Sequence, residues 1–272
     1  MGPLGLIIPM EGGGAEDDAH HWPPGVHSFD PKPLFPDAGM DWLNTYLLQA
    51  VIGAVLVILI WLWLAKDQKI VPTFKQWAGE QLYNMVRNGI GREALGPDYR
   101  KFTPYLLALF SFILVNNLFG QFFLTMFPTF SRVGYAYALA LLSWLLYNGV
   151  GIAKHGLGGY LRMMTMPKGV PGPLYVIIIP LEILSNFIVR PVTLALRLFA
   201  NLFAGHLVVI VFVVGGTLLL EQSSFLYALA GGASLLMAFP IFALELFVGA
   251  LQAYIFTVLT AQYVASSLAE DH

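Results

Sequence analysis

Residues 173–215 read PLYVIIIPLEILSNFIVRPVTLALRLFANLFAGHLVVIVFVVG, and this run contains one acidic residue and two arginines. An α-helix rises ~1.5 Å per residue, so the run would extend for about 65 Å as a helix. That length is about twice the hydrocarbon thickness of a bilayer. The run therefore holds either two membrane spans or one long helix that crosses at a strong tilt. Residues 225–268 form a second run of similar length and leave the same two alternatives.

Three shorter apolar runs precede these two, and each has about the 20 residues that a spanning helix needs. They are residues 42–65, 103–127 and 135–153. If each long run crosses once, the chain crosses the membrane about five times. We therefore predict an all-α, polytopic membrane protein with one membrane domain over residues 42–272 and a C-terminal hairpin of two long tilted helices.

The composition agrees with a membrane protein and excludes several other classes. Hydrophobic residues make up 57% of the chain and charged residues 11%, which is about half the charged share of soluble domains. A net charge of -2 argues against a polybasic nucleic-acid binder, and the apolar content argues against disorder. The chain has no cysteine, which excludes disulfides, thiolate zinc sites and iron–sulfur clusters. We expect contact with membrane lipid, and no cofactor or metal.

Charge predicts the orientation, because positively charged loops stay on the cytoplasmic side. Residues 1–41 hold seven acids and one base, whereas residues 66–102 hold seven bases and four acids. Residues 154–172 hold three bases and no acid. The N-terminal tail over residues 1–41 is then outside, and five crossings leave the C-terminus inside. Dividing one long run into two spans would move the C-terminus outside, whereas dividing both would leave it inside.

Residues 71–92 mix aromatic and aliphatic side chains with charged ones. This pattern predicts an amphipathic helix on the inner membrane surface. An ordinary cytoplasmic loop is the alternative.

Ionisable side chains inside a membrane are costly and indicate function by default. On an ideal helix at about 100° per residue, six polar side chains of the first long run share an arc of about 100°. They are Glu182, Asn186, Arg190, Thr193, Arg197 and Asn201. A polar seam that joins helices would explain Asn186 and Thr193, and Arg190 could reach lipid phosphates. Neither explanation suits Arg197, which has only apolar neighbours in sequence.

The second long run carries a matching stripe of Glu245, Gln252, Tyr263 and Ser266. In an antiparallel hairpin, facing residues have nearly constant number sums. The pairs that satisfy this condition are Arg197 with Gln252, His206 with Glu245, and Glu182 with Ser266. One register therefore places His206 and Glu245 toward the outside, Arg197 and Gln252 deeper, and Glu182, Tyr263 and Ser266 toward the inside.

Two further asparagines, Asn116 and Asn117, lie near the outer end of the second span. They either line the outer polar path or lie at the membrane interface. On the ideal wheel, His206 lies opposite Arg197, so the outer path is displaced sideways from the arginine stripe.

The sequence RPVTLALRLFANLFAGH (residues 190–206), with YIFTVLTA (residues 254–261), resembles subunit a of bacterial F-type ATP synthases. The resemblance extends from about Thr103 to the end of the chain. It implies a stationary membrane subunit packed against a rotating ring of c subunits, each with a mid-membrane carboxyl group. Protons would enter by one half-channel, ride on the ring and leave by the other. Further implied partners are the peripheral-stalk b (or b-delta type) subunits and the remaining ATP synthase subunits.

The resemblance also implies roles for single residues. Arg197 matches the essential arginine between the half-channels, and His206 and Glu245 match the outer pair. Asn201 and Gln252 match polar partners, and Glu182 matches an inner acid. Less specific candidates for the proton path are Asn116, Asn117, Ser185, Asn186, Tyr263 and Ser266. Some relatives carry acids at the positions of Ser266, Asn116 and Asn117, so this chain departs from them there. No ATP-hydrolysing site is expected in this chain.

Two other functions remain as alternatives. A secondary ion or solute transporter with a charged midplane site is the first, although the chain shows no repeated halves. An intramembrane hydrolase is the second, but the chain contains neither HExxH nor GxSxG.

Overall fold

The computed structural model describes residues 44–66, 68–121, 129–166, 174–222 and 224–269. The predicted tail over residues 1–41 and the residues after Ala269 lie outside this part of the chain. Helices dominate the described residues, and five of them are long and apolar enough to cross a membrane. The predicted all-α, polytopic fold with about five crossings is confirmed.

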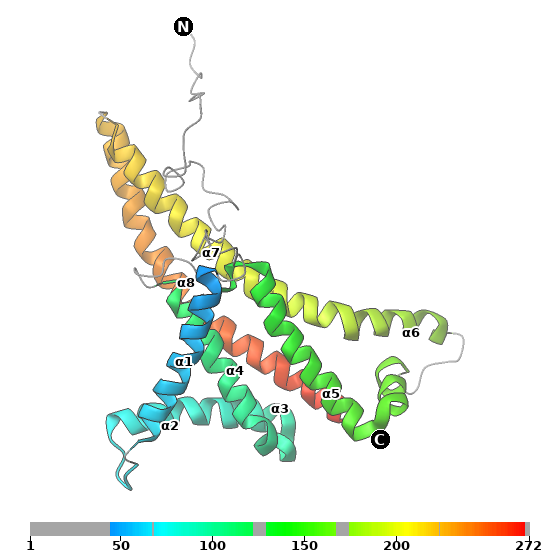
Figure 1. Cartoon of the computed structure of the whole chain (residues 1–272). Helices are drawn as coiled ribbons and strands as arrows, with labels where there is room; N and C mark the ends of the chain where they lie inside the picture. The colour runs from blue at the N-terminus through cyan, green and yellow to red at the C-terminus, as the bar shows by residue number, and fades with distance from the viewer. Residues whose placement is uncertain (1–43, 67, 122–128, 167–173, 223, 270–272) are drawn as a thin grey trace.

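The first half of the chain forms a framework of three long helical runs. The helix α1 begins after Asn44, whose side-chain oxygen accepts a hydrogen bond from the Leu47 backbone nitrogen and thus caps the first turn. The following elements are α1 (Thr45–Ala65), α2 (Phe74–Asn84), a π-helical segment (Met85–Arg92), α3 (Glu93–Leu95), α4 (Tyr99–Phe119) and α5 (Val133–Thr165). In Figure 1, α2 crosses the lower end of α1 nearly at right angles, and α4 rises from near α3 and packs against α1.

The predicted loop that follows the third span, from residue 154 on, is helical as far as Thr165 in the structure. Helical residues continue from Val133 to Thr165, but Gly156 has φ 71° and ψ 160°, so the helix is broken there. Only glycine adopts this conformation readily. Residues 157–165 therefore form a separate helical segment that turns back at the lower end of α5 (Figure 1).

Each of the two long C-terminal runs is one long helix, which decides between the two alternatives. The first comprises α6 (Tyr175–Ile183), a π-helical segment (Leu184–Val189) and α7 (Arg190–Leu220). The second is α8 (Phe225–Leu268), with the bounds that the sequence predicted. The two run antiparallel over their contact, and both are bent (Figure 1). Prolines contribute to the bends, because Pro191 follows the π-helical segment and Pro240 lies inside α8.

The core lies where α4, α5, α7 and α8 cross. Its fully buried side chains include Leu106, Ile113, Leu198, Leu202 and Phe256. Close helix contact continues toward the tip of the hairpin, where Gly216 and Gly231 face each other. Glycine permits this approach because it has no Cβ.

Candidate functional site

The polar stripe of the α6–α7 run is not continuous in the structure. Asn186 is buried and Glu182 is half-buried, whereas Arg197 and Asn201 are exposed on the surface of the chain. The π-helical segment Leu184–Val189 lies between the two groups. A π-helix turns less per residue than an α-helix, so it rotates the residues after it relative to those before it. An ideal α-helical wheel misses this rotation.

Arg197 lies near the middle of the α6–α7 run, 22 residues after Tyr175 and 23 before Leu220. No described residue makes an ion pair or hydrogen bond with its guanidinium. Gln252, which is buried, instead accepts a hydrogen bond from Asn201 Nδ2 at 2.9 Å. The predicted pairing of Arg197 with Gln252 is therefore displaced by about one helical turn.

His206 and Glu245 meet across the hairpin, as the register predicts. His206 Nδ1 lies 3.8 Å from Glu245 Oε1, and both side chains are buried. Gly205 makes this approach possible, because a Cβ at that position would lie 3.1 Å from Glu245 Cγ. His206 faces the protein interior while Arg197 faces outward, in agreement with their opposite positions on the wheel.

Asn116 and Asn117 are both buried, so neither lies at an exposed interface. Asn117 Nδ2 donates to the Gly249 carbonyl at 2.8 Å and thereby joins α4 to α8 one turn beyond Glu245. Asn116 faces a different neighbour, because its Oδ1 accepts a hydrogen bond from Thr129 Oγ1 at 3.0 Å. Of the two, Asn117 lies closer along α8 to the His206–Glu245 pair.

Several buried polar atoms near this pair have no hydrogen-bond partner among the described residues. They include Asn117 Oδ1 and Gln252 Nε2. The Gln121 side chain lies next to the Glu245 carboxyl group. A buried polar atom left unsatisfied costs about 1–3 kcal/mol, so this region suits water or an exchanging proton. We call Asn117, Gln121, His206, Glu245 and Gln252 the polar seam. The sequence analysis missed Gln121, which lies in the turn after α4, although the predicted span over residues 103–127 contains it.

A second set of polar contacts lies at residues 182–190, toward the predicted inner side of the membrane. Asn186 Nδ2 donates to Glu182 Oε2 at 3.0 Å, and Arg190 Nη1 lies 3.4 Å from Ser266 Oγ. The Arg190 guanidinium also lies over the Tyr263 ring, 5.2 Å from its centroid. Ser266 therefore contacts Arg190 and not Glu182, which corrects the predicted Glu182–Ser266 pairing. Ser185 is half-buried beside this group.

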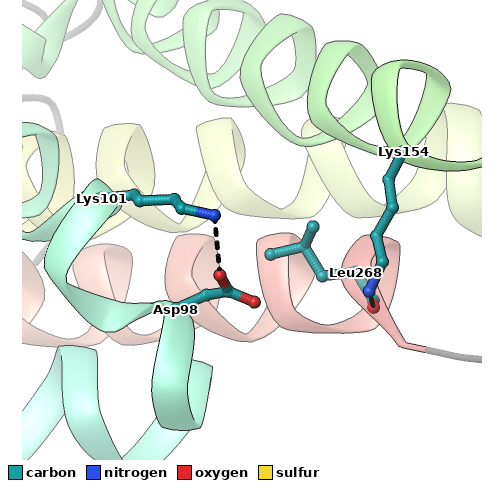
Figure 2. Close-up of polar contacts among 4 residues, drawn as sticks. All are labelled: Asp98, Lys101, Lys154 and Leu268. Atoms are coloured by element: carbon teal, nitrogen blue, oxygen red, sulfur yellow. Dashed lines mark hydrogen bonds and ion pairs between the residues drawn. The ribbon is translucent and has the colours of Figure 1, made fainter.

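A cavity of about 410 Å³ lies away from these residues, between the start of α4, the middle of α5 and the end of α8. Figure 2 shows its charged lining, where Lys101 Nζ is 3.0 Å from Asp98 Oδ1 and Lys154 Nζ donates to the Leu268 carbonyl at 2.8 Å. Lys154 thus caps the last turn of α8. Among the described residues, no three His, Asp or Glu side chains converge to hold a metal ion.

Comparison with known proteins decides the family. The family model described as "ATP synthase A chain" matches residues 47–265. The chain belongs to the ATP synthase subunit a family. The sequence is 44% identical to ATP synthase subunit a of Nocardioides sp. over 92% of this chain and 94% of the relative. It is 40% identical to the subunit a of Pseudarthrobacter chlorophenolicus over 94% and 97%, and 33% identical to that of Streptomyces lividans over 92% and 88%.

Family membership confirms the resemblance seen in residues 190–206 and 254–261. A bacterial subunit a with these spans is a multi-pass protein of the plasma membrane and a component of a multi-subunit ATP synthase. The transporter and hydrolase alternatives are therefore not retained.

Proposed function

We propose that the chain is the stationary proton-conducting subunit of the ATP synthase membrane sector. In this proposal two offset half-channels meet a rotating ring of c subunits, and Arg197 separates them. The observation that carries the proposal is an exposed arginine at the middle of a membrane-spanning helix, which has no partner among the described residues, on the same helix as the histidine of a buried carboxyl–imidazole pair.

The exposed position of Arg197 favours binding of a polar partner from another subunit on this face of the hairpin. A guanidinium that faces hydrocarbon at mid-membrane costs about 2.5–3.5 kcal/mol on insertion scales. A ring carboxyl group supplies the missing opposite charge. The same charge favours the ionised form of that carboxyl group and releases its proton. Arg197 does not give up its own proton, so protons do not pass across it between the half-channels.

The polar seam supports the outer half-channel. His206 and Glu245 are titratable groups 3.8 Å apart, and Asn117 Oδ1, which has no partner among the described residues, offers a site for water between α4 and α8. Imidazole exchanges protons near neutral pH, which suits a proton relay. Asn201, exposed beside Arg197 and bonded to buried Gln252, links this seam to the ring-facing surface.

Glu182 supports the inner half-channel. It lies on the other side of Arg197 along the helix and accepts a hydrogen bond from Asn186, and two turns later Arg190 contacts Tyr263 and Ser266. The orientation follows from the basic loops, so the N-terminus lies outside and the C-terminus is cytoplasmic. The peripheral-stalk b (or b-delta type) subunits and the other ATP synthase subunits are the remaining proposed partners.

The proposal is tested with Arg197→Ala in inverted membrane vesicles that contain the assembled complex. We expect ATP synthesis driven by a proton gradient to be lost, because nothing then releases the ring proton or blocks leakage. Arg197→Lys should restore little, since a buried ammonium can lose its proton. Thr217→Ala is the matched control, because Thr217 is exposed on the same helix and its hydroxyl group donates only to the Val214 carbonyl of that helix. Coupled synthesis by Arg197→Ala at the control rate would overturn the proposal.

A further inference from the structure

The helical segment 157–165 packs against α5 through the side chain of Tyr160. Gly156 reverses the chain, and Tyr160 then lies 1% exposed against α5. Its ring occupies the space above Gly151, where a Cβ would lie 2.2 Å from Tyr160 Cε2. No residue other than glycine fits at position 151 with the ring in this place.

The hydroxyl group of Tyr160 joins two long helices. It donates to Asn148 Oδ1 of α5 at 2.9 Å and lies 3.5 Å from Ser267 Oγ in the last turn of α8. Both partners are buried. The segment is therefore attached to α5 and α8 through a buried polar contact as well as through packing.

One turn after Tyr160, the same segment reaches the helix that carries Glu182. The Met164 carbonyl accepts a hydrogen bond from Asn186 Nδ2 at 2.9 Å. The same amide nitrogen donates to Glu182 Oε2 at 3.0 Å, and Tyr147 Oη donates to the Asn186 carbonyl at 3.1 Å. Asn186 lies in the π-helical segment, where the regular α-helical hydrogen bonds are interrupted, so these contacts fix its place.

We propose that the segment 157–165, anchored by Tyr160, is a positioning element for Glu182. It holds Asn186 through the Met164 carbonyl, and Asn186 orients the Glu182 carboxylate. Tyr160 is thus a positioning residue and not part of the proton path. This inference rests on the proposed function, because it assigns the segment to the inner half-channel acid.

The proposal has a consequence for the rate of proton uptake. If the segment is displaced, Asn186 loses its contact with the Met164 carbonyl and no longer holds the Glu182 carboxylate in place. A misplacement of about 1 Å in a reacting group can slow a reaction about a hundredfold. Tyr263 contacts both Arg190 and Tyr147, and all three are unchanged in the variants below.

The test uses the whole complex in inverted vesicles, where the medium contacts the inner surface and supplies the protons for ATP-driven pumping. Gly151→Ala pushes the Tyr160 ring away, and Tyr160→Phe keeps the ring but removes its hydroxyl group. We expect Gly151→Ala to lower the pumping rate per assembled complex about tenfold, as a displacement of about half an ångström predicts, while ATP hydrolysis by the released catalytic head is unchanged. Tyr160→Phe should lower the rate less, because it keeps the ring, and Tyr160→Ala as much as Gly151→Ala. Gly149→Ala is the matched control, because nothing lies within 4 Å of its Cβ position.

Two further results separate the possible failures. An unchanged pumping rate per assembled complex in Gly151→Ala and Tyr160→Ala, whatever the amount of complex, would overturn the positioning role. If Glu182→Gln abolishes pumping at the same time, the proposed inner half-channel still stands. Normal pumping by Glu182→Gln would instead remove Glu182 from the proton path, and the proposed function would fail at that point.

Discussion

Replacement of Gly205 by alanine is the smallest change that displaces the Glu245 carboxyl group. A Cβ at position 205 would lie 3.1 Å from Glu245 Cγ, and 3.3 Å from both Cδ and Oε1. Non-bonded carbon atoms prefer a separation of about 3.5–4.0 Å. Glu245 must therefore retreat by about half an ångström, because the added methyl group is fixed to the backbone of α7.

This retreat changes the contact that the proposed outer half-channel uses. His206 Nδ1 and Glu245 Oε1 are already 3.8 Å apart, beyond the ~2.7–3.2 Å of a hydrogen bond. A misplacement of about 1 Å in a reacting group can slow a reaction about a hundredfold, so half of it corresponds to about tenfold. We expect ATP-driven proton pumping by Gly205→Ala to fall about tenfold, while ATP hydrolysis by the released catalytic head is unchanged.

The assay is acidification of inverted vesicles on addition of ATP, normalised to the amount of assembled complex. Gly232→Ala is the control, since it adds the same methyl group to the hairpin where nothing lies within 4 Å. Equal pumping by the two alanine variants would refute the reasoning, because the close contact at Gly205 would then have no functional effect.

Two further predictions concern the same hairpin. Gly231→Ala places a Cβ 2.7 Å from the Gly216 carbonyl oxygen, and since overpacking costs about 1–3 kcal/mol, the purified complex should lose its subunits at a lower temperature than Gly232→Ala; identical melting would contradict the close helix approach. His206→Leu and Glu245→Leu should each slow pumping, whereas the exchange of His206→Glu with Glu245→His should recover more activity than either half alone. This is measured from about pH 6 to 9, and wild-type pumping by both leucine variants across that range would exclude the pair from the proton path.

The pairing of His206 with Glu245 could be predicted from the sequence alone. Both residues are ionisable within long apolar runs, and the polar turn between the runs fixes which residues face each other. The structure brings them to 3.8 Å. The prediction was less accurate deeper in the hairpin, where Gln252 bonds to Asn201 and Ser266 lies near Arg190. Bent helices do not keep a constant register, so facing positions drift along their length.

The sequence by itself determined that the chain crosses the membrane several times as helices, because apolar length against bilayer thickness is a local property of the chain. The structure decided that each of the two long runs is one helix. The sequence also determined which polar side chains lie inside the membrane, Arg197 and Glu245 among them. Only the tertiary structure decided which of these side chains face the protein and which face outward. The rotation at Leu184–Val189 and the reversal at Gly156 depend on contacts between separate helical segments, such as Tyr160 on Gly151 and Asn186 on Met164. Hydrophobic periodicity describes one helix at a time, so it carries no information about such contacts.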